Sequence, residues 1–231
     1  MKRIWICCFS FIATLAFGQD NSQTTIEKPK YQRYGLRIGA DISKIGRSIF
    51  DNNYKGLELV ADYRFNHNIY VAAELGYENK NTHTPQLQYT SQGTFLKVGL
   101  DYNTYQNWLD MQNQIFVGFR YATSICNQNL QQYSIYYNTN GFFNQHDLIT
   151  ANREYTGINA HWIELVAGLK VEVLHNLFAG FKIGLYYKLA ATELDNFENL
   201  YIPAFGRTYQ GSNLGIGFNY TISYLIPFKR I

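Results

Sequence analysis

The chain has 231 residues, of which 46% are hydrophobic, 17% aromatic and only 16% charged. This apolar and aromatic content excludes intrinsic disorder, and 20 Tyr and 16 Phe against 2 Met favour strands over helices. The net charge of +3 includes Lys2 and Arg3 in the leader described next; without them 18 basic residues face 17 acidic ones, which gives no support for nucleic acid as a partner.

The first 18 residues have the pattern of a secretory signal peptide. Two basic residues precede a mostly apolar run from Ile4 to Phe17, and small residues stand at the −3 and −1 positions of a cut before Gln19. The run is shorter than the roughly 20 apolar residues of a membrane-spanning helix. We predict a cleaved signal peptide (1–18), a periplasmic linker (19–32) and a barrel (33–231). Only Cys126 lies beyond the leader, so no disulfide within the mature chain is expected.

From Arg33 onward, apolar residues alternate with polar or small ones in eight segments. Alternation with a period of two over about ten residues predicts a β-strand with one apolar face. The predicted strands are residues 33–44, 57–65, 69–78, 96–103, 115–122, 162–173, 177–188 and 214–224.

The charged face of these predicted strands is also their glycine face. Ten glycines lie on it, at positions 35, 39, 76, 99, 118, 168, 180, 184, 215 and 217. A solvated face gains nothing from glycines, which weaken strands. The narrow lumen of an eight-stranded barrel, in contrast, needs small side chains beside large ones. Seven cations and eight carboxylates share this face, and a closed interior requires such near balance because each unpaired buried charge costs several kcal/mol.

We therefore predict an ion-pair network inside the lumen. Its residues are Arg37, Glu58, Asp62, Arg64, Glu74, Lys97, Asp101, Arg120, Glu164, Lys170, Glu172 and Lys182. The opposite face carries no charge in the central part of any segment, as lipid demands at about 2–4 kcal/mol for a misplaced Lys or Arg at midplane. The sequence predicts an all-β fold, an eight-stranded antiparallel transmembrane β-barrel of the outer membrane, with a soluble barrel as the alternative.

The connections between the predicted strands alternate in length. Those after the second, fourth and sixth strands are shorter, at residues 66–68, 104–113 and 175–176; the others are longer, at residues 45–54, 79–92, 127–157 and 191–212. Short periplasmic turns and long extracellular loops are typical of outer-membrane barrels. Inward-facing Phe95, Phe116, Trp162 and Phe178 predict a lumen that is packed shut rather than an open pore.

Six stretches carry a resemblance to a known family, at residues 34–43, 51–60, 101–108, 161–166, 199–203 and 220–228. They resemble an uncharacterised outer-membrane family of Bacteroidota, classed as a domain of unknown function, which has Gly where this chain has Ala204. Members tend to be encoded beside a small lipoprotein and look like accessory subunits of the outer-membrane barrel-assembly machinery. The resemblance therefore implies outer-membrane lipid, a larger outer-membrane barrel and a small lipoprotein as partners.

Catalysis has little support in the sequence. Small outer-membrane barrels that modify lipid A use His with Ser or an acid near the outer rim, and the candidates here are His83, His146 and His161. His161 and Glu164 are three apart on one predicted strand and point to opposite faces. The other two histidines lie in predicted loops without a Ser/His/acid arrangement. We expect no enzyme, no cofactor and no metal site, since neither a phosphate-binding loop nor a metal-ligand spacing is present.

Three functions follow as hypotheses. The first is a non-catalytic accessory subunit of an outer-membrane complex; the second is a free-standing surface adhesin or defence barrel, for which projecting strand-like loops are expected; the third is a lipid A-modifying enzyme. The two longest loops should bind the partner, because long loops are usually functional and aromatic residues are enriched in interface hot spots. The predicted contact residues are Phe197, Tyr201, Pro203, Phe205, Tyr136 and Phe142. In the alternative, the loops pack on one another as a lid over the lumen.

Overall fold

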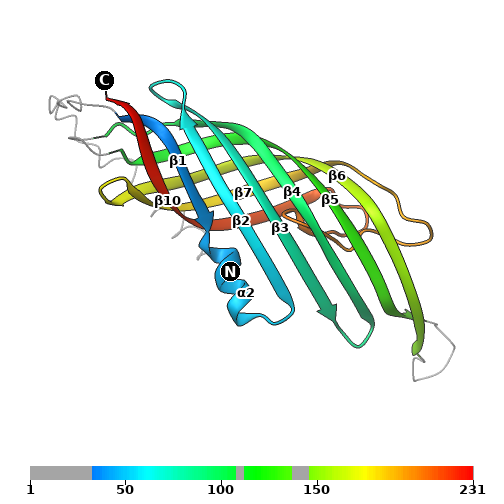
Figure 1. The fold of residues 1–231 in the computed structure, drawn as a ribbon. Helices are drawn as coiled ribbons and strands as arrows, with labels where there is room; N and C mark the ends of the chain where they lie inside the picture. The colour runs from blue at the N-terminus through cyan, green and yellow to red at the C-terminus, as the bar shows by residue number, and fades with distance from the viewer. Residues whose placement is uncertain (1–32, 108–111, 137–145, 231) are drawn as a thin grey trace, which may run out of the picture.

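The computed structural model describes residues 33–107, 112–136 and 146–230, so the predicted signal peptide and linker lie outside it. Eight long antiparallel strands close into a barrel in the order β1-β10-β7-β6-β5-β4-β3-β2 (Figure 1). Their bounds are β1 Arg33–Asp41, β2 Tyr54–Arg64, β3 Ile69–His83, β4 Leu87–Asn103, β5 Gln114–Tyr136, β6 His146–Leu174, β7 Leu177–Ala191 and β10 Leu214–Arg230. The predicted eight-stranded antiparallel barrel is confirmed.

The two faces of the strands point as the alternation predicts. The inward rings of Phe95, Phe116, Trp162 and Phe178 are buried. Glycines make room for them, since a Cβ at Gly76 would overlap the Phe95 ring. Outward apolar side chains remain uncovered along every strand of the barrel, with Leu165 at 61% and Leu169 at 43% exposure. The barrel is thus polar inside and apolar outside, the reverse of a water-soluble protein.

Three connections are short, at residues 65–68, 104–113 and 175–176. They lie at the same end of the barrel as the pair Arg33↔Arg230, where β1 begins and β10 ends. We call this the turn end, and the opposite end the loop end.

The first predicted strand is too long. Residues 42–44 belong instead to helix α2, Ile42–Phe50, which begins where β1 ends. The Asp41 carboxylate accepts a hydrogen bond from the Ser43 N–H at 2.8 Å and caps the helix. Ile42, Ile45 and Ile49 follow at helical spacing. Among the described residues, no helix is long and apolar enough to cross a membrane.

Much of two predicted long loops is strand instead, and residues 137–145 of the second lie outside the described residues. β3 continues to His83 and β4 starts at Leu87, while β5 and β6 stay paired as far as Tyr136↔His146. The β6–β7 ladder ends earlier, at Ala160↔Ala191, so one side of the barrel rises above the other (Figure 1). We call this raised part, residues 79–83, 87–92, 126–136 and 146–159, the high wall. It is rich in Thr, Tyr, Asn and Gln on both faces, so the apolar alternation stops although the β structure continues.

The connection between β7 and β10 folds back over the lumen. It contains a two-residue hairpin, β8 Tyr201–Ile202 and β9 Gly206–Arg207. The non-glycine residue Ala204 takes a positive φ of 66° in the hairpin turn, a backbone conformation that favours Gly. This hairpin is the lid that the sequence allowed as an alternative to a projecting loop.

Candidate functional site

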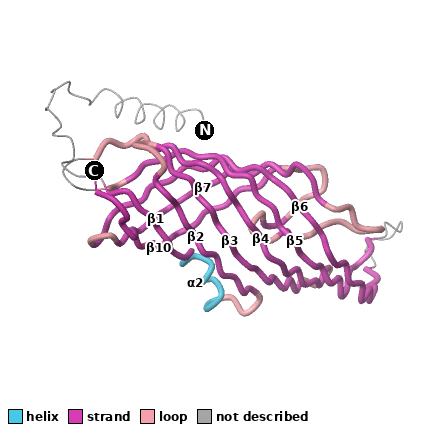
Figure 2. Tube along the Cα trace, turned by 45° about the horizontal axis from the view of Figure 1, so that its top comes forward, coloured by secondary structure: helices cyan, strands magenta, loops and turns pink. Residues whose placement is uncertain are grey.

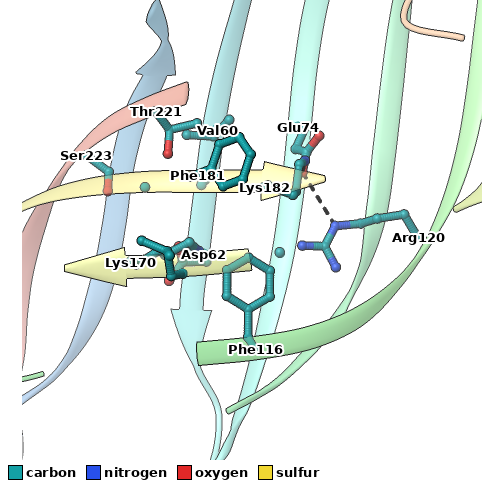
Figure 3. Close-up of a pocket in the computed structure, with 14 residues that line it drawn as sticks. Val60, Asp62, Glu74, Phe116, Arg120, Lys170, Phe181, Lys182, Thr221 and Ser223 are labelled. Carbon is teal, nitrogen blue, oxygen red and sulfur yellow. Dashed lines mark hydrogen bonds and ion pairs between the residues drawn. The ribbon is translucent and has the colours of Figure 1, made fainter. Parts of the chain in front are cut away.

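The lumen is filled by a continuous set of ion pairs centred on Glu74 of β3. Glu74 pairs with Lys182 of β7, with Lys97 of β4 at 3.6 Å and with Arg120 of β5 at 3.5 Å. Arg120 also reaches Asp101 at 2.8 Å. Figure 3 shows Glu74, Lys182 and Arg120 converging from different strands. The Glu74 carboxylate therefore links β3 to β7 on the opposite side of the barrel.

Further ion pairs lie towards both ends of the barrel. Towards the turn end, Asp62 accepts from Arg37 at 2.7 Å and from Lys170 at 2.6 Å. At the turn end itself, Arg33 donates to both carboxylate oxygens of Glu172 at 2.7 Å. Towards the loop end, Lys97 pairs with Glu164 at 3.0 Å, and the Trp162 indole donates to Glu164 at 2.7 Å.

Among the lumen residues that are buried or ion-paired in the described part of the chain, charges of the two signs are equal in number. The cations are Arg33, Arg37, Lys44, Arg64, Lys97, Arg120, Lys170 and Lys182; the carboxylates are Asp41, Glu58, Asp62, Glu74, Glu78, Asp101, Glu164 and Glu172. Breaking one such buried pair typically costs about 3–5 kcal/mol, because the remaining charge is left uncompensated. The cavity at the centre of the network, at about 30 Å³, has room for water only. The network seals the barrel rather than lining a channel.

All twelve predicted network residues face the lumen. Arg64 differs in its contacts, since it donates to the His67 carbonyl at 2.8 Å and stacks over the Tyr34 ring at 4.8 Å. Arg33 and Lys44 complete the network and were not predicted. Arg33 stands at the start of the predicted strand 33–44, on the same face as Gly35 and Arg37, so the alternation already directed it towards the lumen. Lys44 enters from helix α2, so strand periodicity gave no signal for it.

The lid closes the loop end of the lumen with a small apolar core. Ile202 and Phe205 are buried against Phe95, Trp162 and Tyr186, and the Phe205 and Trp162 rings meet edge to face at 5.8 Å. A second cluster joins the lid to the high wall, with Tyr201 between Tyr89 and Leu130.

The lid also has polar anchors. The Tyr201 hydroxyl donates to Glu78 at 2.6 Å, and the Ala204 N–H donates to the same carboxylate at 3.1 Å. Burial, with the neighbouring Glu78 charge, raises the pKa of Tyr201, so the hydroxyl keeps its proton and remains a donor at neutral pH. The lid is therefore fixed by both packing and hydrogen bonds.

The predicted partner-binding residues do not form one exposed surface. Tyr201, Pro203 and Phe205 are buried in the lid, so they are unavailable to a partner while the lid is closed. Phe197 is half-buried and packs on Tyr133 of the high wall at 5.6 Å. The Tyr136 side chain and all of Phe142 lie outside the described residues. Aromatic composition alone could not separate a lid core from an interface.

The histidines do not assemble a catalytic site among the described residues. His161 stacks with Tyr121 and makes a 3.0 Å hydrogen bond with its hydroxyl on the outer face of the barrel. Glu164 lies in the lumen, as the opposite faces of one strand require. His83 is exposed at the end of β3, and the His146 side chain lies outside the described residues. No three His, Cys, Asp or Glu side chains of the described part are grouped as a metal site.

No curated protein matches the chain. One similar solved structure is the crystal structure of Ail, the attachment invasion locus protein of Yersinia pestis, with a TM-score of 0.42, 9% sequence identity, and coverage of 86% of this chain and 98% of that chain. A family model described as "Domain of unknown function (DUF6048)" matches residues 1–231. The chain belongs to this family.

Proposed function

We propose that this member of the DUF6048 family is an integral outer-membrane barrel that acts without catalysis, as an accessory subunit of an outer-membrane protein complex. The observation that carries the membrane part is the reversed polarity of the barrel. Outward residues such as Leu100, Val117 and Leu185 are about half exposed, whereas the charges face a sealed lumen. A monomeric soluble protein rarely exposes an apolar belt of this extent, and lipid is the solvent that suits it.

Because ion pairs fill the lumen, we expect the functional surface to lie on the outside of the barrel. The cavity at the centre of the network, at about 30 Å³, has room for water only, and the described histidine side chains show no Ser/His/acid arrangement. Both observations support contact with another protein as the activity of this barrel. The family resemblance makes the barrel-assembly machinery the first complex to test, with a larger outer-membrane barrel and a small lipoprotein as the expected partners.

Membrane embedding is tested by labelling single cysteines with a membrane-impermeant maleimide in intact outer membranes, in a Cys126→Ser background. Leu169→Cys and Phe181→Cys should stay unlabelled because lipid covers the outward face. The exposed lid residue Asn196, changed to Cys, is the labelled control. Heavy labelling at position 169 or 181 would contradict the assignment of the faces.

The subunit role is tested by isolating the tagged protein from outer membranes in mild detergent. A fixed set of outer-membrane proteins, including a larger barrel, should co-purify in constant ratio. Recovery of the barrel alone, folded and heat-modifiable on gels, would contradict the proposal.

A surface adhesin is the second candidate, and the high wall favours it. The hairpin of β5 and β6 extends beyond its neighbours (Figure 1), which is the projecting strand-like feature expected of an adhesin. Replacing residues 132–150 with a short turn separates the two functions. Loss of binding of whole cells to surfaces or to host material, with unchanged co-purification, would favour the adhesin.

A further inference from the structure

The barrel wall has one place where a helix lies in the position of a strand. β1 pairs with β2 only as far as Ala40↔Leu59 and with β10 only as far as Asp41↔Thr221. β2 and β10 continue towards the loop end through residues 54–58 and 214–220, with no described strand between them. Helix α2 occupies this gap beside β2 (Figures 1 and 2). We call the region formed by α2 and these two strand segments the seam.

The polar contacts of α2 hold it to one side of the seam. The Ser48 hydroxyl accepts from the Gly56 N–H at 2.8 Å and donates to the Gly56 carbonyl at 3.1 Å, so it satisfies the backbone of β2 as a neighbouring strand would. Lys44 pairs with Glu58 of β2 at 2.8 Å and with Glu78 of β3. Arg47 stacks on Tyr54 of β2 at 4.1 Å.

Towards β10, the N-cap residue Asp41 accepts a hydrogen bond from the Asn219 side-chain amide at 2.5 Å, and helix residues 42–50 make no hydrogen bond or ion pair to β10 among the described residues. Instead, a cavity of about 300 Å³ lies at this side of the helix. Ser43 and Arg47 of α2 line it, together with Phe218 and Asn219 of β10 and Phe205 of the lid. Glu78 of β3 and Lys97 of β4 line it as well, so the cavity extends from the seam into the lumen. Among the described residues, polar contacts of the helix itself therefore go to β2 and β3, whereas β10 is bonded only to the N-cap Asp41.

The outward side chains of β10 reflect the missing strand. Ile216 is 80% exposed and Phe218 is 63% exposed. Their register partners on β7, Leu185 and Ile183, are 52% and 49% exposed, because β7 has a strand on both sides. The free edge of β10 thus lies among protruding apolar side chains at the membrane-facing surface.

The unpaired edge of β10 at residues 214–220 determines which kind of molecule can bind there. A strand edge carries a row of unpaired N–H and C=O groups, and in lipid each unsatisfied group costs several kcal/mol. An acyl chain could fill the cavity but could not bond to these groups. An extended polypeptide could, since its own backbone groups match the edge at a spacing of about 4.8 Å.

We infer that the seam is a docking site for an extended segment of a partner protein, which pairs with residues 214–220 of β10 when α2 moves aside while staying tied to β2. The inference rests on the subunit role proposed above and specifies its contact. The segment should carry apolar side chains on its lipid face. It should carry small or neutral ones towards the lumen, because the Lys44 charge there is already met by Glu58 and Glu78.

Photo-crosslinking in intact cells tests this contact. A photoreactive amino acid is placed at Ile216 or Phe218, and at their register partners Leu185 and Ile183 as matched controls. The seam positions should yield adducts with the polypeptide that co-purifies with the unmodified barrel. The two sites of attachment should lie two residues apart in a single extended segment, since β pairing has a period of two. Lipid adducts alone at the seam, or equal protein adducts at the controls, would overturn the inference.

Hydrogen exchange provides a second measurement on the native protein. Amides of residues 214–220 should exchange at least about tenfold more slowly in the isolated complex than in the barrel alone, because they gain backbone hydrogen bonds. Residues 221–226, paired with β1 in both states, are the internal control. A co-purified partner without this protection defeats only the seam inference, whereas absence of any partner defeats the proposed function as well.

Discussion

The high wall and the seam are built in opposite ways. In the high wall, β5 and β6 run for 23 and 29 residues and are supported from inside by the lid. At the seam, β1 stops after nine residues, and a helix with no fully buried residue completes the wall. Stability in a folded protein is distributed according to such local packing and hydrogen bonding. The comparison indicates a rigid raised sheet on one side and a part that can open on the other.

The largest effect should come from the network that both regions share. Glu74→Gln removes the carboxylate that faces three cations, and we expect a loss of about 3–5 kcal/mol in the free energy of unfolding. Thermal unfolding in detergent, followed by the heat-modifiable gel shift, measures the loss. Glu154→Gln, at an exposed position of the high wall, is the control and should change little. Equal stability of the two variants would show that the lumen pairs contribute no net stability.

A smaller effect should follow from detaching the lid. Phe205→Ala should cost about 3 kcal/mol locally, because the ring packs against Trp162 and Tyr186. Protease cleavage within residues 192–213 should become faster while the barrel stays folded. The matched variant is Tyr209→Ala, which removes an exposed ring from the same connection. Unchanged cleavage in Phe205→Ala would mean that the lid is held by its hydrogen bonds alone.

The third change separates the seam from the high wall. Ser48→Ala removes both hydrogen bonds to Gly56, for an expected loss of about 1–2 kcal/mol. Hydrogen exchange should accelerate at residues 54–58 and remain unchanged in the high wall. Ser134→Ala is the control, since its hydroxyl has no hydrogen-bond partner in the described part of the chain. Faster exchange throughout the barrel would show that the seam is not an independent unit.

A stabilising change is expected in the lid turn. Ala204→Gly relieves the positive φ of 66° and should add up to about 1 kcal/mol of stability. Ala190→Gly, at an exposed strand position, should instead lose about 0.5–1 kcal/mol. Melting temperatures of the two variants measure the difference, and a shift of the same sign in both would contradict the assigned turn conformation.

The smallest effect should come from the ion pair between Lys80 and Asp51 at the surface beside the seam. Lys80 donates to the Asp51 carboxylate at 3.0 Å and lowers the pKa of this partly exposed group. A carboxylate whose pKa is lower in the folded state stabilises the fold at pH values above its unfolded-state pKa. This contribution is lost as the pH falls through the folded-state pKa. Asp51→Asn should leave the melting temperature at pH 7 unchanged within error. It should remove only the contribution of Asp51 to the loss of stability at acidic pH. A clear drop at pH 7 would assign Asp51 a structural role.

The barrel and its network were predictable because lipid outside and a closed lumen inside impose opposite polarities on alternate residues. Glu74, Lys97 and Arg120 could therefore be assigned to one interior without knowing which pairs they form. Helix α2 was missed although Asp41 and the spacing of Ile42, Ile45 and Ile49 predict it. The strand alternation happens to continue through Lys44, and the two periods overlap there.

The sequence by itself determined the number of strands, the direction of each face and the balance of the lumen charges, because these depend on period and composition. Only the tertiary structure decided that residues 79–92 and 127–157 include further strand, since polar residues occur on both faces there and the inner face packs against the lid, so the polarity contrast disappears. It also decided that Tyr201 and Phe205 point inward. An aromatic ring lowers the free energy equally well in a lid core or at an interface, so its direction depends on what the rest of the fold places beneath it.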